Sequence, residues 1–234
     1  MKKKFLDTNL KFKKKIVEQK LQFFTYKNKT LPLPTEIEIS ESGTCNRTCS
    51  FCPRSDPGFE DKKEFIKNDL HLKLCNELNE VNYTGTIRYS GFVEPLLDKN
   101  IYNLISMARK LMPNCNIELV TNGDPLNTSR LKKLFLNGLN KILISSYDGK
   151  EETEKLKDLC LAARLKEDQY IIRHRYLSED QDFGITLSNR AGLMENAEYK
   201  IKPLDRALKN PCYIPSYTFF LDYQGDVLMC PHDW

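Results

Sequence analysis

Short apolar or alternating segments recur along the chain from residue 35 onward, and each is typical of a β-strand. They cover residues 37–39, 86–89, 116–120, 141–145, 169–172 and 185–187. Longer stretches with the apolar spacing of helices separate them, at about 62–80, 98–112, 127–138 and 150–165. Because strands that alternate with helices of this length form βαβ units, the pattern predicts an α/β body around a parallel sheet.

The two ends of the chain depart from this alternation. Residues 1–30 have the apolar spacing of an amphipathic, lysine-rich helix, and the prolines in 31–34 then favour an extended chain. Beyond about residue 200 the helical patterns stop, and 217–229 predicts a β-hairpin with Gln224 and Gly225 near its turn. We therefore expect three parts: an N-terminal helix and proline linker (1–34), an α/β core (35–200) and a small β extension (201–234).

Composition and charge exclude several classes of protein. Hydrophobic residues make up 40% and charged residues 29%, as in ordinary folded proteins. The net charge is +4, from 36 basic and 32 acidic residues, and this balance argues against nucleic-acid binding. No signal-peptide pattern is visible, and no apolar run approaches the roughly 20 residues of a membrane-spanning helix. We therefore expect a cytoplasmic protein, in which eight cysteines are metal ligands, reactive thiols or core residues rather than disulfides.

Three cysteines, Cys45, Cys49 and Cys52, lie within eight residues directly after the first predicted strand. Thiolates are soft ligands that suit zinc and iron–sulfur clusters. Three of them can hold three irons of a cubane and leave the fourth iron open. A zinc site would need a fourth ligand, for which His71 and His232 are candidates. An enzyme with a cluster is therefore one interpretation, and a non-catalytic zinc- or cluster-binding interaction module is the other.

The segment 45–52 resembles the CxxxCxxC signature of radical S-adenosylmethionine (SAM) enzymes, including an aromatic residue, Phe51, before the last cysteine. Residues 90–97 are similar to the Gly-x-Gly-Glu-Pro segment of that family, although Val93 stands where the family usually has glycine. The resemblance implies a partial (β/α)6 TIM-like barrel, a [4Fe–4S] cluster and SAM. It also implies an electron donor such as flavodoxin or ferredoxin, and a radical that abstracts hydrogen from a small-molecule or peptide substrate.

The same resemblance implies roles for individual residues at the carboxyl ends of the predicted strands, where parallel α/β barrels build active sites. Cys45, Cys49 and Cys52 would bind the cluster, and the cofactor contacts would be Phe51, Gly91, Glu94, Pro95, Asn122, Ser145, Tyr147 and Arg173. Arg88, Phe92 and Arg190 are candidates for the pocket wall. Relatives mature peptides, oxidise alcohols, or epimerise and dehydrate sugars, and the sequence does not select among these reactions.

Two further cysteines, Cys212 and Cys230, flank the predicted C-terminal hairpin. The spacing from Gly225 to Cys230 resembles the opening half of a SPASM or twitch extension, in which such a hairpin ligates an auxiliary [4Fe–4S] cluster. Further cysteines normally follow in that family, whereas this chain stops at Trp234. We therefore expect a truncated product or fragment, with an auxiliary cluster only in a longer form. The alternative is that Cys212 and Cys230 are packing residues in the core of the hairpin. Cys75, Cys115 and Cys160 are likewise expected to be small core residues, in the α/β body.

Overall fold

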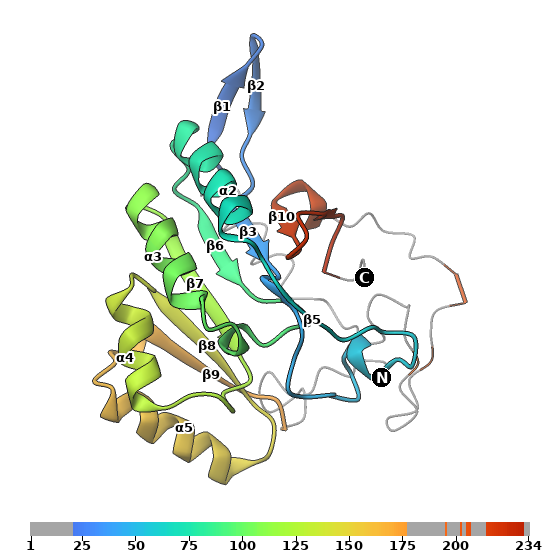
Figure 1. Ribbon diagram of the computed structural model, residues 1–234, viewed down its shortest axis with the longest axis vertical. Coiled ribbons are helices and arrows are strands. Elements are labelled where there is room, and N and C mark those ends of the chain that lie inside the picture. Colours follow the sequence, from blue (N-terminus) through green and yellow to red (C-terminus); the bar gives the residue numbers. More distant parts are fainter. Residues whose placement is uncertain (1–20, 177–194, 196–201, 203–204, 207–213, 232–234) are drawn as a thin grey trace, which may run out of the picture.

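The computed structural model describes residues 21–176, 195, 202, 205–206 and 214–231. Its central feature is a seven-stranded sheet with the strand order β11-β10-β3-β6-β7-β8-β9 (Figure 1). The strands are β3 (Glu36–Ile39), β6 (Thr86–Tyr89), β7 (Asn116–Thr121), β8 (Lys141–Ser146), β9 (Tyr170–His174), β10 (Thr218–Leu221) and β11 (Val227–Leu228). The neighbours from β10 to β9 all pair in parallel, and only β11 runs antiparallel to its partner β10. The predicted α/β fold with a mainly parallel sheet is therefore confirmed.

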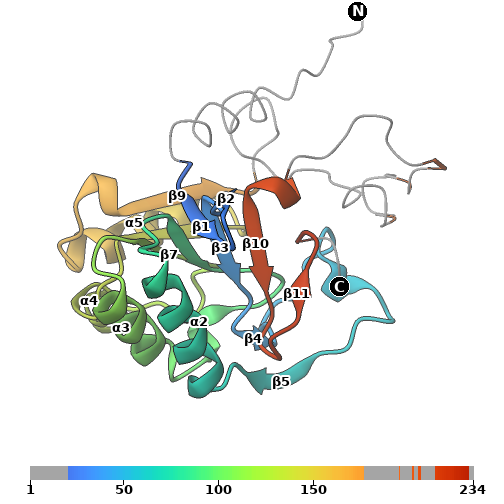
Figure 2. The same cartoon turned by 90° about the horizontal axis from the view of Figure 1, so that it is seen from above.

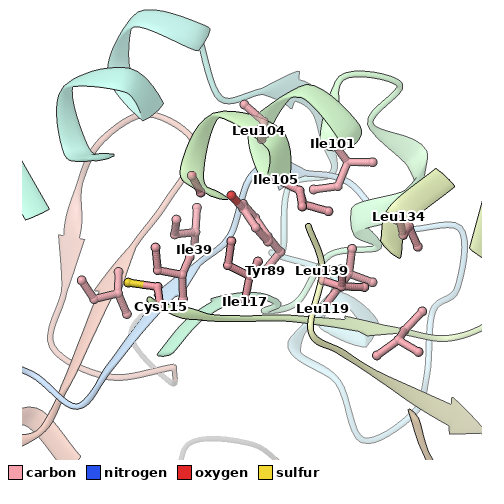
Figure 3. Packing of buried hydrophobic residues seen from close by; sticks show 14 of the residues in the cluster. Ile39, Tyr89, Ile101, Leu104, Ile105, Cys115, Ile117, Leu119, Leu134 and Leu139 are labelled. Carbon is pink, nitrogen blue, oxygen red and sulfur yellow. The ribbon is translucent and has the colours of Figure 1, made fainter. Parts of the chain in front are cut away.

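Four helices cover one face of this sheet (Figures 1 and 2). They are α2 (Asn68–Glu80), α3 (Ile101–Leu111), α4 (Thr128–Leu136) and α5 (Lys150–Ala162), and they follow β5, β6, β7 and β8 along the chain. Alternate strand residues point at the helices and are almost completely buried, among them Ile39, Tyr89, Ile117 and Leu119. Figure 3 shows these side chains packed against Ile101, Leu104 and Ile105 of α3. The period-two burial in the strands therefore places the hydrophobic core between the sheet and the helices.

The opposite face of the sheet carries charged side chains. Arg88 in the centre of β6 pairs with Glu36 of β3 and Glu118 of β7, at 2.5 and 2.8 Å. Ser90 donates a hydrogen bond to Glu38 on the same face. In the part of the chain that the structure describes, no pairing closes β9 onto β11, so the sheet is an open one. The predicted strand at 185–187 lies outside the described residues.

Two segments expected as helix are strands instead. Residues 23–30, expected within an N-terminal helix, form most of a hairpin of β1 (Phe23–Tyr26) and β2 (Lys29–Pro32) that projects from the body (Figure 1). Lys27 and Asn28 at its tip have φ angles of 46° and 63°, the left-handed conformation of a two-residue hairpin turn. Residues 62–65 form β5 (Lys62–Phe65), which pairs with β4 (Ser42–Gly43). All four β5 residues are exposed, so this segment lacks the apolar stripe that would dock a helix.

The predicted C-terminal hairpin is present as β10 and β11, with Gly225 at φ 98° in its turn. Rather than standing apart from the α/β body, its first strand joins the main sheet beside β3. Short 3₁₀ helices complete the described elements: η1 (Pro53–Ser55), η2 (Pro95–Leu97), η3 (Glu167–Gln169) and η4 (Ile214–Ser216). Among the helices that the structure describes, none has the length and apolar character needed to cross a membrane.

Candidate active site

The cysteine loop, residues 44–55, follows β4 and ends with η1. Cys45, Cys49 and Cys52 are each partly exposed. The backbone N–H of Cys52 donates to the carbonyl of Cys49 at 2.9 Å, and Pro53 opens η1 directly afterwards. Because proline fixes φ at a value suited to the first helical position, the turn that presents Cys49 and Cys52 is preorganised by the sequence.

The three thiols are neighbours, but they do not converge on one point. Burial, and then the proximity of Cys52 and Cys45, raises the pKa of Cys49 to about 11. Ligands of one tetrahedral zinc ion would lie about 4 Å apart, given a Zn–S bond of about 2.3 Å. Among the described residues, the one set of three potential ligands within 4.8 Å of each other is Asp124, Asp148 and Glu152. Thiols that are close enough to disfavour each other's ionisation, yet too far apart for one ion, fit separate irons of a cluster.

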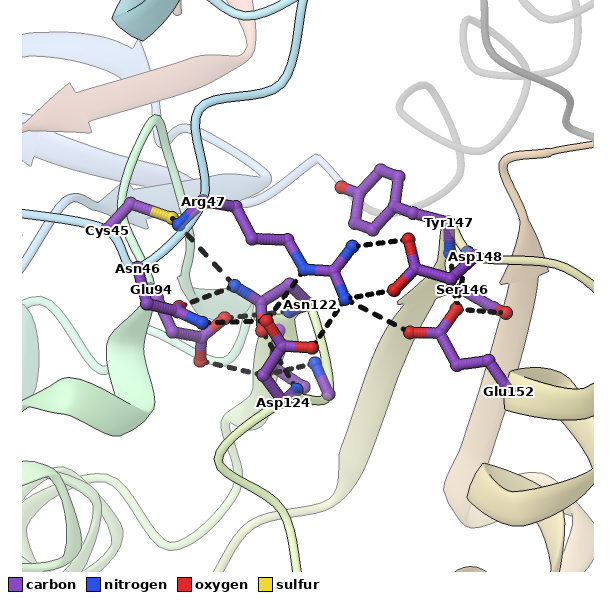
Figure 4. Close-up of polar contacts among 12 residues, drawn as sticks. Cys45, Asn46, Arg47, Glu94, Asn122, Asp124, Ser146, Tyr147, Asp148 and Glu152 are labelled. Atoms are coloured by element: carbon purple, nitrogen blue, oxygen red, sulfur yellow. Dashed lines mark hydrogen bonds and ion pairs between the residues drawn. The ribbon is translucent and has the colours of Figure 1, made fainter.

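Glu94 connects the segments that follow β6 and β7 (Figure 4). Its carboxylate is 1% exposed. Oε1 accepts hydrogen bonds from Leu96 N at 3.0 Å and Thr121 Oγ1 at 2.7 Å, and Oε2 accepts one from Asn122 N at 2.7 Å. Burial raises the pKa of Glu94 to about 7, although these three hydrogen bonds oppose the shift. The backbone N–H of Glu94 also donates to the carbonyl of Thr44 in the cysteine loop.

Asn122 extends this connection to the first cysteine. Its Nδ2 donates to Asn46 Oδ1 at 2.8 Å and lies 3.9 Å from Cys45 Sγ. Its Oδ1 accepts a hydrogen bond from Asp124 N. A chain of contacts therefore runs from the buried Glu94 through Asn122 to the partly exposed cysteine loop, and it holds the ends of β6 and β7 against that loop.

The backbone after β6 requires one glycine but not two. Gly91 has a φ of 134°, and a side chain there would collide with Ser40 Oγ. Val93 is absent from the residues with positive φ, so valine fits this path where the family usually has glycine. Pro95 is buried and opens η2, with Glu94 as its N-cap. The departure from the family motif at Val93 therefore leaves the local fold intact.

Polar and aromatic residues at the ends of β8 and β9 complete the predicted set. The rings of Phe51 and Tyr147 stack with their centroids 5.8 Å apart. Arg173 Nη2 donates to Ser145 Oγ at 2.9 Å, whereas its buried Nε has no partner among the described residues. Burial, with Arg175 nearby, lowers the pKa of Arg173 to about 10. A guanidinium with an unused buried donor is suited to an anionic group of a ligand.

Arg47 is a residue to which the sequence motifs gave no role. Its guanidinium pairs with Asp124 after β7, and with Asp148 and Glu152 after β8 (Figure 4). These pairs raise the pKa of Arg47 and lower that of Asp148. The one hint in the sequence is that an arginine lies inside the cysteine motif while acidic residues follow two of the predicted strands.

Several predicted residues lie elsewhere. His71, proposed as a fourth zinc ligand, is fully buried in α2 and bonds Tyr89 Oη at 2.8 Å, on the helix side of the sheet. Arg88 is occupied by its ion pairs with glutamates.

The remaining cysteines differ in burial. Cys230 follows β11 and is partly exposed. Cys75, Cys115 and Cys160 are buried in the core, as predicted. Arg190, Cys212 and His232 lie outside the described residues.

A cavity of about 390 Å³ lies beside the cysteine loop, at the carboxyl ends of β3, β6 and β10. Its walls include Glu38 and Ser40 within and after β3, Phe92 and Val93 after β6, and Phe220 and Tyr223 in and after β10. It is therefore on the sheet face opposite the helices. Volumes of this size accommodate small organic molecules.

Comparisons with known proteins agree with this geometry. The family model described as the radical SAM superfamily matches residues 39–179. The S-adenosyl-L-methionine-dependent 2-deoxy-scyllo-inosamine dehydrogenase of Niallia circulans is 29% identical over 200 residues, which cover 85% of this chain and 74% of the relative. The crystal structure of BtrN in complex with AdoMet and 2-DOIA is 25% identical, with a TM-score of 0.68 over 86% of this chain and 74% of that one. BtrN in an open conformation, 23% identical with a TM-score of 0.57 over 86% and 72%, shows the same fold.

Proposed function

This chain belongs to the radical SAM superfamily, and from that premise we propose that it oxidises a hydroxyl group of a small, sugar-like molecule. The match includes all three cysteines of the loop and the ends of β3, β6, β7, β8 and β9. The protein is an enzyme of the oxidoreductase type that uses a [4Fe–4S] cluster and SAM. A purely non-catalytic zinc module, the other interpretation of the cysteines, has no support from His71.

The main structural support for this choice of substrate is the cavity beside the cysteine loop. Its volume of about 390 Å³ suits a molecule the size of a cyclic polyol. The relative from Niallia circulans, which aligns with most of this chain, is a dehydrogenase of 2-deoxy-scyllo-inosamine. Peptide maturation, sugar epimerisation and sugar dehydration are the other reactions of the family, and the experiment below distinguishes them.

We assign the cluster to Cys45, Cys49 and Cys52, with one iron left for SAM. When bound, the cluster and SAM supply a 5′-deoxyadenosyl radical that takes a hydrogen atom from the substrate. At the end of β6, Gly91, Glu94 and Pro95 shape the wall for the methionine end of the cofactor. The bend after β6 that Gly91 allows, and the hydrogen bond from Glu94 N to the Thr44 carbonyl in the cysteine loop, support this placement.

The residues after β7, β8 and β9 would hold the rest of the cofactor. Phe51 and Tyr147 offer stacked aromatic surface to the adenine. Asn122 and Ser145 provide polar atoms for the ribose. Arg173, with its unpartnered Nε, provides the positive charge for the carboxylate.

Oxidation of an alcohol to a ketone also requires that one further electron and one proton leave the substrate. An auxiliary [4Fe–4S] cluster would provide an acceptor for that electron, and we propose Cys230 and Cys212 as two of its ligands in a longer form of the protein. A flavodoxin or ferredoxin is the proposed donor for the first cluster. Such reductants, and cysteines that serve as cluster ligands, fit the cytoplasm, which we propose as the location.

The test uses anaerobically reconstituted protein with dithionite, SAM and 2-deoxy-scyllo-inosamine deuterated at each carbinol carbon in turn. We expect deuterium in 5′-deoxyadenosine and a ketone product from one of these substrates. Cys49→Ala should abolish both, whereas Cys160→Ala, which alters a buried thiol of α5, should retain both. If polyols yield no ketone and transfer no deuterium while SAM is still cleaved, the dehydrogenase proposal is wrong. A peptide or an epimerised sugar as the product would replace it.

A further inference from the structure

We propose that Arg47 is a positioning residue that fastens the cysteine loop to the ends of β7 and β8. The inference rests on the proposed cluster site for its functional meaning. The contacts of Arg47 with Asp124, Asp148 and Glu152 are features of the fold and do not depend on a bound cluster. Arg47 lies between Cys45 and Cys49, so any movement of its backbone moves two of the three proposed cluster ligands.

The first connection is to the segment after β7. Arg47 Nε and Nη2 contact Asp124 Oδ2 and Oδ1 at 2.7 and 2.5 Å, a two-pronged contact with one carboxylate. Asn46, the neighbour of Arg47, donates to the same Asp124 Oδ2 at 2.7 Å. Asp124 is itself placed by Gly123, whose φ of 85° and close contact with Leu156 leave no room for a side chain.

The second connection is to the segment after β8. Arg47 Nη1 and Nη2 contact Asp148 Oδ1 and Oδ2 at 2.9 and 2.7 Å, and Nη2 also lies 3.3 Å from Glu152 Oε1. The guanidinium thus forms two forked contacts along two of its edges. Lysine cannot reproduce them, because its ammonium is a single point of charge.

The acidic partners are built into the fold and not merely carried on flexible loops. Glu152 Oε2 accepts hydrogen bonds from Ser146 Oγ, Tyr147 N and Asp148 N, at 2.7, 2.7 and 2.8 Å. The carboxylates of Asp124, Asp148 and Glu152 have oxygens within 4.8 Å of one another. Three such charges repel each other, and the guanidinium of Arg47 is the cation that the structure places among them.

An aromatic contact couples this ion-pair network to the proposed adenine site. The Arg47 guanidinium lies over the ring of Tyr147, 5.2 Å from its centroid. Tyr147 in turn stacks on Phe51, which precedes Cys52 in the cysteine loop. Arg47 and Phe51 therefore hold the end of β8 from two points of the same loop. Loss of Arg47 should loosen the loop and misplace the Phe51–Tyr147 pair.

The experiment compares Arg47→Gln and Arg47→Lys with Arg109→Gln as a matched control. Arg109 also makes several contacts, but to the carbonyls of Gly138, Pro113 and Cys115, which precede β8 and β7 at the strand ends opposite those that face the cysteine loop. Two quantities are measured: amide hydrogen exchange of residues 44–55 in the metal-free chain, and the affinity of the reconstituted protein for SAM. Loss of charge-assisted hydrogen bonds should speed exchange and weaken SAM binding by about tenfold or more in Arg47→Gln. Arg47→Lys should fall between this variant and wild type.

Arg109→Gln should lower overall stability without altering either quantity. In an Asp124→Asn background, Arg47→Gln should have a smaller effect, because part of its contact is already lost. If the exchange rates and the SAM affinity of Arg47→Gln both stay within about twofold of wild type, the proposal is wrong, because the loss of a single charged contact already predicts a larger change. If Arg47→Gln does not fold, a wild-type result for Arg47→Lys would overturn it equally. The exchange measurement needs no cluster, so it can fail or succeed independently of the proposed function.

Discussion

Acid should destabilise this protein through His71, because the fold buries the imidazole in its neutral form. His71 lies on α2 with none of its surface exposed, and its Nε2 is 2.8 Å from Tyr89 Oη. Cys75 Sγ lies 3.6 Å from its Nδ1. Burial lowers the pKa of His71 to about 4. A protonated imidazole in this position would lose its hydration, and its hydrogen-bond neighbours Tyr89 and Cys75 do not carry a compensating carboxylate.

The size of this loss of stability follows from the difference between the pKa of His71 in the folded chain and its pKa in the unfolded chain. The unfolded chain binds a proton at His71 below a pKa of about 6.5, whereas the folded chain does so only near 4. The contribution of His71 to stability is therefore nearly constant above pH 7, and it is lost as the pH falls through 6.5 towards 4. The full loss is about 3 kcal/mol, of which about 2 kcal/mol falls between pH 7 and pH 5.

The assay is urea unfolding, followed by circular dichroism at pH 5, 6, 7 and 8, for wild type and His71→Gln. Glutamine is neutral throughout this range and its amide can still bond Tyr89. Buried carboxylates with raised pKa values, such as Glu94, contribute an opposite slope, but they do so in both proteins. From pH 7 to pH 5, the stability of wild type relative to the variant should drop by about 2 kcal/mol.

The control is Leu78→Ala, which removes a buried side chain from the same helix and should lower stability equally at every pH. Parallel pH profiles for wild type and His71→Gln would refute the reasoning. They would mean that the imidazole binds a proton as readily in the folded chain as in the unfolded one.

Other substitutions test the site itself. Glu94→Ala should leave the cluster in place but weaken SAM binding by about ten- to a hundredfold, and an unchanged affinity in a titration followed by electron paramagnetic resonance would place Glu94 outside the cofactor site. Gly91→Ala should lower the free energy of unfolding by about 1–3 kcal/mol, because its φ of 134° and the nearby Ser40 Oγ exclude a side chain; an unchanged urea midpoint would contradict this. Cys230→Ala should leave the iron content of this chain near one cluster, whereas two clusters in wild type, one of them lost in the variant, would reveal ligands not yet identified.

The sequence predicts the secondary structure correctly wherever the local hydrophobic pattern matches the burial of the side chains in the fold. In β6, β7 and β8, alternate apolar residues such as Ile87, Leu119 and Ile144 are the ones buried against the helices. Asn127, predicted to begin a helix, accepts a hydrogen bond from Arg130 N at the start of α4. These features depend on neighbours within a few residues, so period and capping chemistry suffice to predict them.

The sequence failed where distant segments decide the structure. Residues 62–65 become a strand because β4 pairs with them, and β10 enters the sheet because β3 accepts it across more than 170 residues of chain. Arg47 could not be assigned for the same reason. Its three carboxylate partners lie 77, 101 and 105 residues away, and only the packing of the sheet brings them together.

The cluster is the central claim, and the formation of 5′-deoxyadenosine by single cysteine variants tests it most directly. Wild type, reconstituted with iron and sulfide and then reduced, should release 5′-deoxyadenosine from SAM. Cys45→Ala, Cys49→Ala and Cys52→Ala should each lose both the cluster absorbance and this product, because each thiolate is assigned its own iron. Cys115→Ala, which alters a buried thiol beside β7, should retain both. Cleavage of SAM at the wild-type rate by any one of the three loop variants would contradict the assignment.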